Sequence, residues 1–169
     1  MIFLLLLSLL ACHKQIDIDE KYKIAFDYIK SSQAKNNYFN KDYSIMVSDS
    51  VVFMEISSFF DEIKIMKNKN EGFDQEQLLD SLLYYDKTNY FKTFSLRGLK
   101  NLSTSNKSKL ILFFSKPVGN ILMAELIYNY NSFRSYRKIT TLNRSIMFLF
   151  YFDNNNNIEK VLTTEVQNE

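Results

Sequence analysis

The feature that most constrains the fold is a change of sequence pattern near residue 88. Before it, apolar residues recur at the spacing of a helix face. In Glu20–Lys35 they fall at positions i, i+3, i+4 and i+7, as Tyr22, Ala25, Phe26 and Ile29. After it, short runs rich in aromatic and branched residues are separated by turn-forming residues, a pattern typical of strands and hairpins. Helices followed by antiparallel hairpins favour an α+β fold.

We therefore expect N-terminal helices packed on one face of a curved, C-terminal antiparallel sheet, an order that a cystatin-like or NTF2-like arrangement would fit. A second helix is predicted after a cap at Ser48, and its apolar face would consist of Val52, Ile56, Phe59, Phe60 and Ile63. A third is predicted over Gln75–Tyr85, with an apolar stripe of Leu78, Leu79, Leu82 and Leu83. Strands are predicted over Tyr43–Val47, Lys109–Ser115, Ile121–Tyr130, Ser145–Asp153 and Ile158–Val166, and the last two would be joined by a turn at Asn154–Asn157.

The N-terminal segment is apolar from Ile2 to Ala11 except for one serine. This run is about half the roughly 20 residues that a membrane-spanning helix needs, and its length and position are typical of an export signal. Its last residues, Leu9-Leu10-Ala11-Cys12, resemble the lipobox of bacterial lipoproteins. The resemblance implies cleavage after Ala11 and acylation of Cys12 with fatty acids such as palmitate. An ordinary signal, or a buried first element with a structural Cys12, remains the alternative.

The resemblance also implies a division of the chain and a location. Residues 1–11 would be a lipoprotein signal peptide, 12–19 a lipidated tether and 20–169 a single α+β domain. The protein would be lipid-anchored to a membrane of the bacterial cell envelope, which we expect to be the Gram-negative outer membrane, and would face the periplasm or the surface. Two or three acyl chains give a stable anchor, whereas one gives only marginal binding.

The residues available for catalysis are few. The single histidine, His13, adjoins Cys12, so no positioned imidazole is expected for Ser-His-Asp or Cys-His chemistry or for a zinc site. No glycine motif for phosphate binding is present, and no cofactor, metal ligand or catalytic residue is assigned. Paired carboxylates remain an alternative, since a hydrolase can work with two. The nearest pairs in sequence are Asp61 with Glu62, and Glu76 with Asp80.

Charge is distributed unevenly along the chain. Residues 87–152 hold 11 Lys or Arg and one acid, Glu125, a net charge of +10, whereas 13–86 and 153–169 have net charges of −5 and −3. The densest basic part contains Arg134, Arg137, Lys138 and Arg144. We expect these four residues to bind an anionic lipid, a polysaccharide or an acidic protein; nucleic acid is not expected in the envelope. The alternative is internal compensation by the acidic helices.

The sequence therefore predicts a non-catalytic binding or structural module with a basic face. The alternatives are a carboxylate-dependent envelope hydrolase and an immunity-type inhibitor of a toxin.

Overall fold

The computed structural model describes residues 19–40, 42–67, 74–105, 108–128, 136 and 144–167. Its helices are α1 (Glu20–Ser31), α2 (Gln33–Tyr38), α3 (Phe60–Lys67) and α4 (Gln75–Asn89), with two 3₁₀ helices, η1 (Ile56–Phe59) and η2 (Arg97–Leu102). Its strands are β1 (Ile45–Val51), β2 (Phe94–Ser95), β3 (Leu110–Phe114), β4 (Ile121–Tyr128), β5 (Arg144–Phe152) and β6 (Ile158–Gln167). Helices and a largely antiparallel sheet confirm the α+β class.

The six strands form one sheet in the order β2-β1-β3-β4-β5-β6. β3, β4, β5 and β6 follow one another as antiparallel neighbours, as the hairpin pattern predicted. β1 lies beside β3 and parallel to it, so the first half of the chain contributes an internal strand to the sheet. The sheet is therefore mixed and not confined to the C-terminal half.

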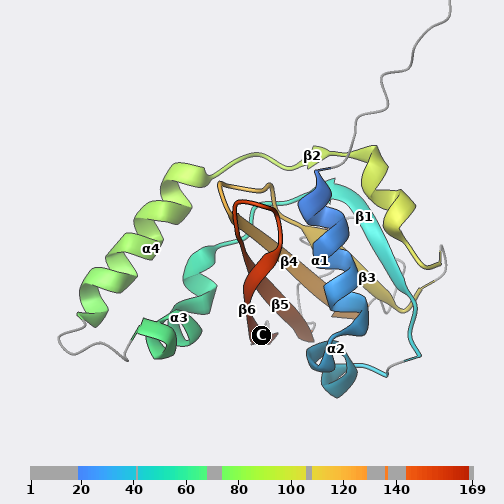
Figure 1. Ribbon diagram of the computed structural model, residues 1–169, viewed down its shortest axis with the longest axis horizontal. Helices are drawn as coiled ribbons and strands as arrows, with labels where there is room; N and C mark the ends of the chain where they lie inside the picture. Colours follow the sequence, from blue (N-terminus) through green and yellow to red (C-terminus); the bar gives the residue numbers. More distant parts are fainter. Residues whose placement is uncertain are drawn as a thin grey trace, which may run out of the picture.

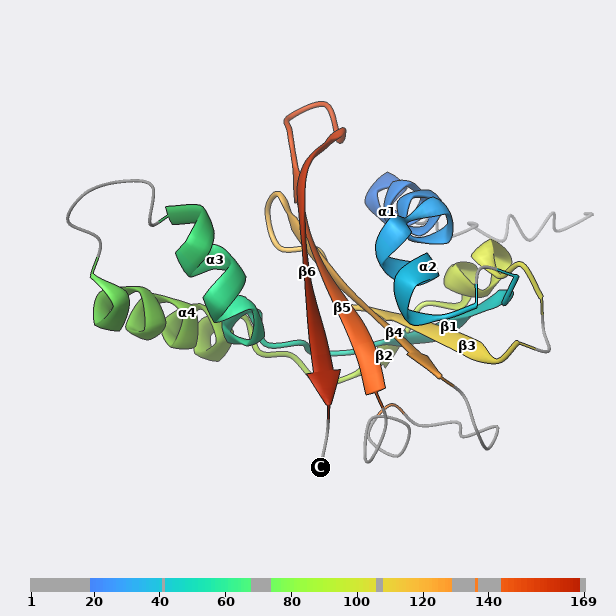
Figure 2. The same cartoon turned by 90° about the horizontal axis from the view of Figure 1, so that it is seen from below.

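The sheet separates two cores, one on each face (Figure 2). In β4, Leu122, Ala124 and Leu126 belong to the first core, and Met123 and Ile127 to the second, because successive strand residues point to opposite faces. α1 packs in the first core and η1, α3 and α4 in the second. Helices thus cover both faces and not the single face expected. The reason is that β3, β4 and β5 are apolar on both sides and need a cover on each.

The first helical segment breaks at Ser32 and does not continue to Lys35 as predicted. Ser32 has an extended backbone, and its Oγ accepts a hydrogen bond from the Lys35 backbone N–H at 3.1 Å, so it caps α2. At the other end of α1, the Asp19 side chain accepts from the Lys21 N–H. The predicted face of α1 is confirmed, since all four of its apolar residues are buried.

The predicted cap at Ser48 is wrong. Ser48 lies inside β1, which runs on to Val51 because it pairs with β3, more than 50 residues away in sequence. The helical turns start only at Ile56 in η1 and continue as α3. Val52, Ile56, Phe59 and Ile63 are nevertheless buried together in the second core.

α4 is longer than predicted and packs through a narrower stripe. Leu78 and Leu82 are buried, whereas Leu79 and Leu83 are 39% and 51% exposed. α4 also carries the buried Asp86, which accepts hydrogen bonds from the backbone N–H groups of Ile56 at 2.7 Å and Ser57 at 3.1 Å. This carboxylate ties α4 to the first turn of η1 and so fixes the segment that borders the pocket described below.

The hairpin between β5 and β6 turns at 153–157, as predicted. The Asp153 carboxylate accepts hydrogen bonds from the backbone N–H groups of Asn155 and Asn157, both at 2.8 Å. A hydrogen bond from the Asn157 side-chain amide at 3.1 Å is the largest cause that holds the pKa of Asp153 below its usual value, and the backbone hydrogen bonds add to it. Asn156 has a left-handed backbone, with φ of 61°, a conformation that asparagine tolerates well.

Candidate functional site

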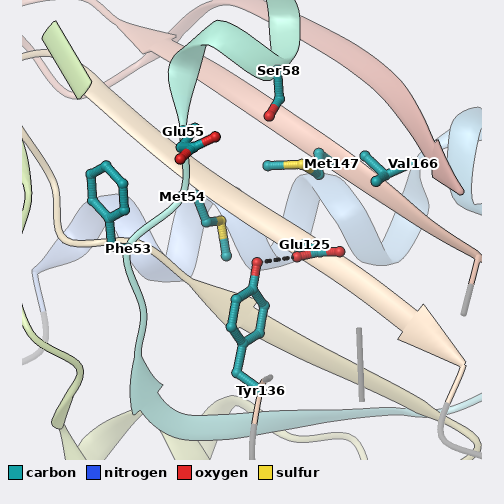
Figure 3. Close-up of a pocket in the computed structure, with 8 residues that line it drawn as sticks. All are labelled: Phe53, Met54, Glu55, Ser58, Glu125, Tyr136, Met147 and Val166. Carbon is teal, nitrogen blue, oxygen red and sulfur yellow. Dashed lines mark hydrogen bonds between the residues drawn. The ribbon is translucent and has the colours of Figure 1, made fainter. Parts of the chain in front are cut away.

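A pocket of about 230 Å³ opens on the second face of the sheet (Figure 3). One wall consists of Phe53, Met54 and Glu55 from the segment between β1 and η1, and of Ser58 from η1. The floor is the sheet itself, which contributes Glu125 from β4, Met147 from β5 and Val166 from β6, and Tyr136 closes another side. The volume is several times the roughly 30 Å³ of one water in the liquid and below the roughly 300–1,000 Å³ of a pocket for a drug-sized ligand. The pocket therefore suits a small molecule.

Glu125 is the polar centre of this pocket. It lies in β4 between Met123 and Ile127 on the same face, and only 2% of it is exposed. Its Oε1 accepts a hydrogen bond from Ser145 Oγ at 2.5 Å, and its Oε2 accepts one from the Tyr136 hydroxyl. Burial raises the pKa of Glu125 above its ordinary value, and the two hydrogen bonds oppose this rise only in part. The carboxyl group is thus held on both oxygens by donors from the protein.

Tyr136 is held in place by its ring and by its hydroxyl. Its ring meets that of Phe113 edge to face, with centroids 5.0 Å apart, on the same face of the sheet as Glu125. Burial raises the pKa of Tyr136, and the charges of Glu125 and, more weakly, Glu55 raise it further. The phenol therefore remains a hydrogen-bond donor at neutral pH.

The rim of the pocket is more polar than its floor. Glu55 directly precedes η1, and its side chain makes no capping hydrogen bond there. Glu55 and Ser58 are both exposed, and Figure 3 shows them on the opposite side of the pocket from Tyr136. Among the described lining residues there are two carboxyl groups and no Lys, Arg or His. Such a lining favours a neutral or cationic ligand and disfavours an anion.

Of the site residues predicted from the sequence, the structure describes only Arg144, which is not among the residues that line this pocket. Cys12, Arg134, Arg137 and Lys138 lie outside the described residues. Arg144 is described: it begins β5, is exposed and lies opposite Gln167 of β6. Whether the four basic residues share a face therefore stays a prediction.

The carboxylate pairs noted in the sequence are not among the residues that line the pocket. Asp61 and Glu62 are in the first turn of α3, and Glu76 and Asp80 are on exposed positions of α4. Sequence reasoning missed Glu125 as a site residue, although it marked this residue as the only acid in a basic stretch. The missed indication was its position inside an apolar strand, ILMAELIY, because a carboxyl group is rarely buried without partners.

Comparisons with models of known protein families, with curated proteins and with solved structures found no match. The cystatin-like or NTF2-like arrangement therefore stays a prediction. Within the residues that the structure describes, no helix is both long enough and apolar enough to cross a membrane, and no three His, Cys, Asp or Glu side chains are grouped as metal ligands.

Proposed function

We propose that this chain is a lipid-anchored, non-catalytic binding module of the bacterial envelope, and that its pocket takes a small neutral or cationic molecule. The lipid anchor is supported by the resemblance of Leu9–Cys12 to a lipobox. The binding role is supported by the pocket on the second face of the sheet. We place the protein at the outer membrane, facing the periplasm or the surface.

The observation that carries the binding role is the combination of two fixed polar groups, Glu125 and Tyr136, with apolar side chains in one pocket. Glu125 and Tyr136 are pre-positioned by their mutual hydrogen bond, so a ligand need not order them. Phe53, Met54 and Met147 supply apolar contact area. Few polar groups at defined positions within an apolar lining are the usual composition of small-molecule sites.

The experiment uses methionine as a probe, because Met54 and Met147 line the pocket whereas Met66 lies in α3 and is not among its lining residues. Mature protein with ¹³C-labelled methionine methyl groups would be titrated in nanodiscs with n-butylammonium, n-butanol and butyrate. These probes have nearly the same size and differ in charge. We expect shifts of the Met54 and Met147 signals with the first two probes and weaker shifts with butyrate. Equal shifts with all three, or equal shifts at Met66, would contradict the pocket's proposed selectivity.

The anchor is tested separately by mass spectrometry of the N-terminal peptide of the mature protein. We expect a peptide that begins at acylated Cys12, and we expect the Cys12→Ser variant to lose the acyl chains and leave the membrane fraction. An unmodified Cys12 in the wild-type protein would contradict the anchor.

The basic face is the third part of the proposal, and the exposure of Arg144 supports it. Crosslinking in intact cells would compare the wild type with a variant that carries glutamate at residues 134, 137, 138 and 144. We expect the wild type to crosslink an acidic protein, anionic lipid or polysaccharide that the variant loses. Equal recovery from both proteins would contradict a role for these charges. The matched control reverses Lys64 and Lys67 of α3.

One observation favours a second candidate function, a carboxylate-dependent hydrolase. Glu55 and Glu125 line the same pocket, and two carboxyl groups in one cleft are the arrangement that such enzymes need. We rank it second because both oxygens of Glu125 already accept hydrogen bonds from Ser145 and Tyr136. An acid catalyst must instead direct its proton at the substrate. Hydrolysis of envelope glycans that is lost in both Glu55→Gln and Glu125→Gln would reverse this ranking.

A further inference from the structure

We propose that the end of the domain where α1 begins docks on the bilayer, and that Tyr90, Lys92, Phe94 and Lys116 contact anionic lipid headgroups there. The inference rests on the proposed anchor at Cys12, and it adds the face of the domain that meets the membrane. The partner that this face would meet is the lipid surface itself.

The tether limits how far the domain can lie from the membrane. Cys12 is eight positions before Glu20, the first residue of α1. Eight residues span at most about 29 Å when fully extended. A domain held on so short a tether meets the headgroups repeatedly with the end from which the tether leaves.

That end is fixed by hydrogen bonds between α1 and the turn that joins β3 to β4. The Lys21 ammonium donates to the Gly119 carbonyl at 2.8 Å, and the Tyr22 hydroxyl donates to the Ser115 carbonyl at 3.1 Å. The start of α1 and residues 115–121 therefore form one rigid end of the domain, at the top of Figure 1.

An aromatic strip adjoins this turn. Residues 90–93 connect α4 to β2, and this connection and β2 run along the same end in Figure 1. Phe91 lines a narrow crevice together with Lys116 and Val118, so the connection and the turn border the same crevice. Two other aromatic residues close to Phe91 in the sequence are more exposed: Tyr90 is 65% exposed and Phe94 is 41% exposed.

The exposed rings are held by other rings. The centroids of Phe53 and Tyr90 are 5.2 Å apart, and those of Phe91 and Phe94 are 5.8 Å apart. Tyr90 and Phe94 thus stay at the surface in a defined arrangement. Aromatic side chains with one face in water are typical of the membrane interface, where ring and headgroup meet.

The charge of this strip suits an anionic surface. No acid occurs in the sequence between Asp86 and Glu125. Lys92, Arg97 and Lys116 are exposed, and none of them forms an ion pair with another described residue. Two acids, Asp19 and Glu20, are at the start of α1, and the Asp19 side chain is engaged in capping the helix. Each Lys or Arg near an anionic bilayer strengthens binding by about fivefold.

The absence of tryptophan from the chain gives a direct test. A Phe94→Trp variant carries a single indole at the proposed contact, and an Ile65→Trp variant carries one on α3, where Ile65 is 70% exposed. Both mature, acylated proteins would be reconstituted in vesicles of phosphatidylcholine with phosphatidylglycerol, with brominated lipid as the quencher. We expect blue-shifted, quenched emission from Trp at 94 and neither effect from Trp at 65. Replacement of Lys92 and Lys116 by glutamine should reduce the equilibrium constant for docking by about fivefold per lysine, whereas Lys67→Gln should not.

The outcomes separate the docking from the anchor. If the N-terminal peptide is acylated and the protein is bound to vesicles, but Trp at 94 is not quenched more than Trp at 65, the docking face is wrong and the anchor stands. If Cys12 is not acylated, the anchor and the docking inferred from it both fall. The tryptophan emission of the Phe94→Trp variant could instead shift to the blue with protein concentration and not with vesicles. That result would show that the strip mediates self-association and would overturn the lipid proposal.

Discussion

Replacing Glu125 with glutamine should make the stability of the protein less dependent on pH. Glutamine has nearly the same shape, its carbonyl can accept from one of Ser145 and Tyr136, and its amide can donate to the other hydroxyl oxygen. Near pH 4 the two side chains are both largely neutral, so we expect free energies of unfolding within about 1 kcal/mol of each other.

The difference should grow as the pH rises. Burial raises the pKa of Glu125 in the folded protein above the ordinary value of 4.5, so the folded state holds this proton more tightly than the unfolded state. Its contribution to stability is therefore complete below about pH 4.5 and is lost as the pH rises toward the folded-state pKa. In that window the wild type loses up to about 1.4 kcal/mol per pH unit relative to Glu125→Gln. The stability of the variant relative to the wild type should therefore increase through that window.

Urea unfolding followed by circular dichroism between pH 4 and pH 8 measures this difference. The free energy of unfolding of the variant is subtracted from that of the wild type, which cancels the contributions of the other titrating groups. Glu76→Gln, on the exposed side of α4, controls for the loss of one carboxyl group. A difference that is flat across this range, or one in which the wild type gains stability relative to the variant, would refute the account of Glu125 as a buried acid whose pKa is raised by folding.

Two further changes test the supports of the fold. Asp86→Ala leaves the backbone N–H groups of Ile56 and Ser57 without their acceptor, so we expect a loss of about 3 kcal/mol in urea unfolding, and little change for the exposed Asp80→Ala; an effect below 1 kcal/mol would mean that water replaces the carboxylate. Asn156→Val should cost about 1–2 kcal/mol in thermal unfolding because a branched residue resists the left-handed backbone at φ 61°, and Asn156→Gly should cost nothing. Equal melting temperatures for both variants would show that this backbone conformation is not maintained.

The sequence was sufficient to predict those helices and strands whose residue pattern is local. The face of α1 follows from spacing within one helix, and β4 and β5 follow from runs of strand-forming residues. It failed at Ser48, because β1 is held by a parallel partner distant in sequence and its apolar residues are also compatible with a helix. The exposed Leu79 and Leu83 show the same limit, since the partners of a helix determine how much of its apolar stripe is covered.

The candidate site was harder to predict than the fold. The lone acid in an apolar strand was visible in the sequence, but its donors come from Tyr136 and Ser145, 11 and 20 residues further along. Glu55 reaches the pocket from the other half of the chain. Only the folding of the β1–η1 segment over the sheet brings these groups together, and no local pattern encodes that arrangement.

The two-sided sheet has a mechanical consequence for a protein held by its N terminus. α1 belongs to the first core, whereas the pocket borders the second. A pull on the tether would therefore act on the interface between α1 and the sheet. The strands lie between this interface and the pocket, so the force would not act directly on the residues that line the pocket. Force applied at the anchor would peel α1 away before it deformed the wall formed by Met54 and Glu55.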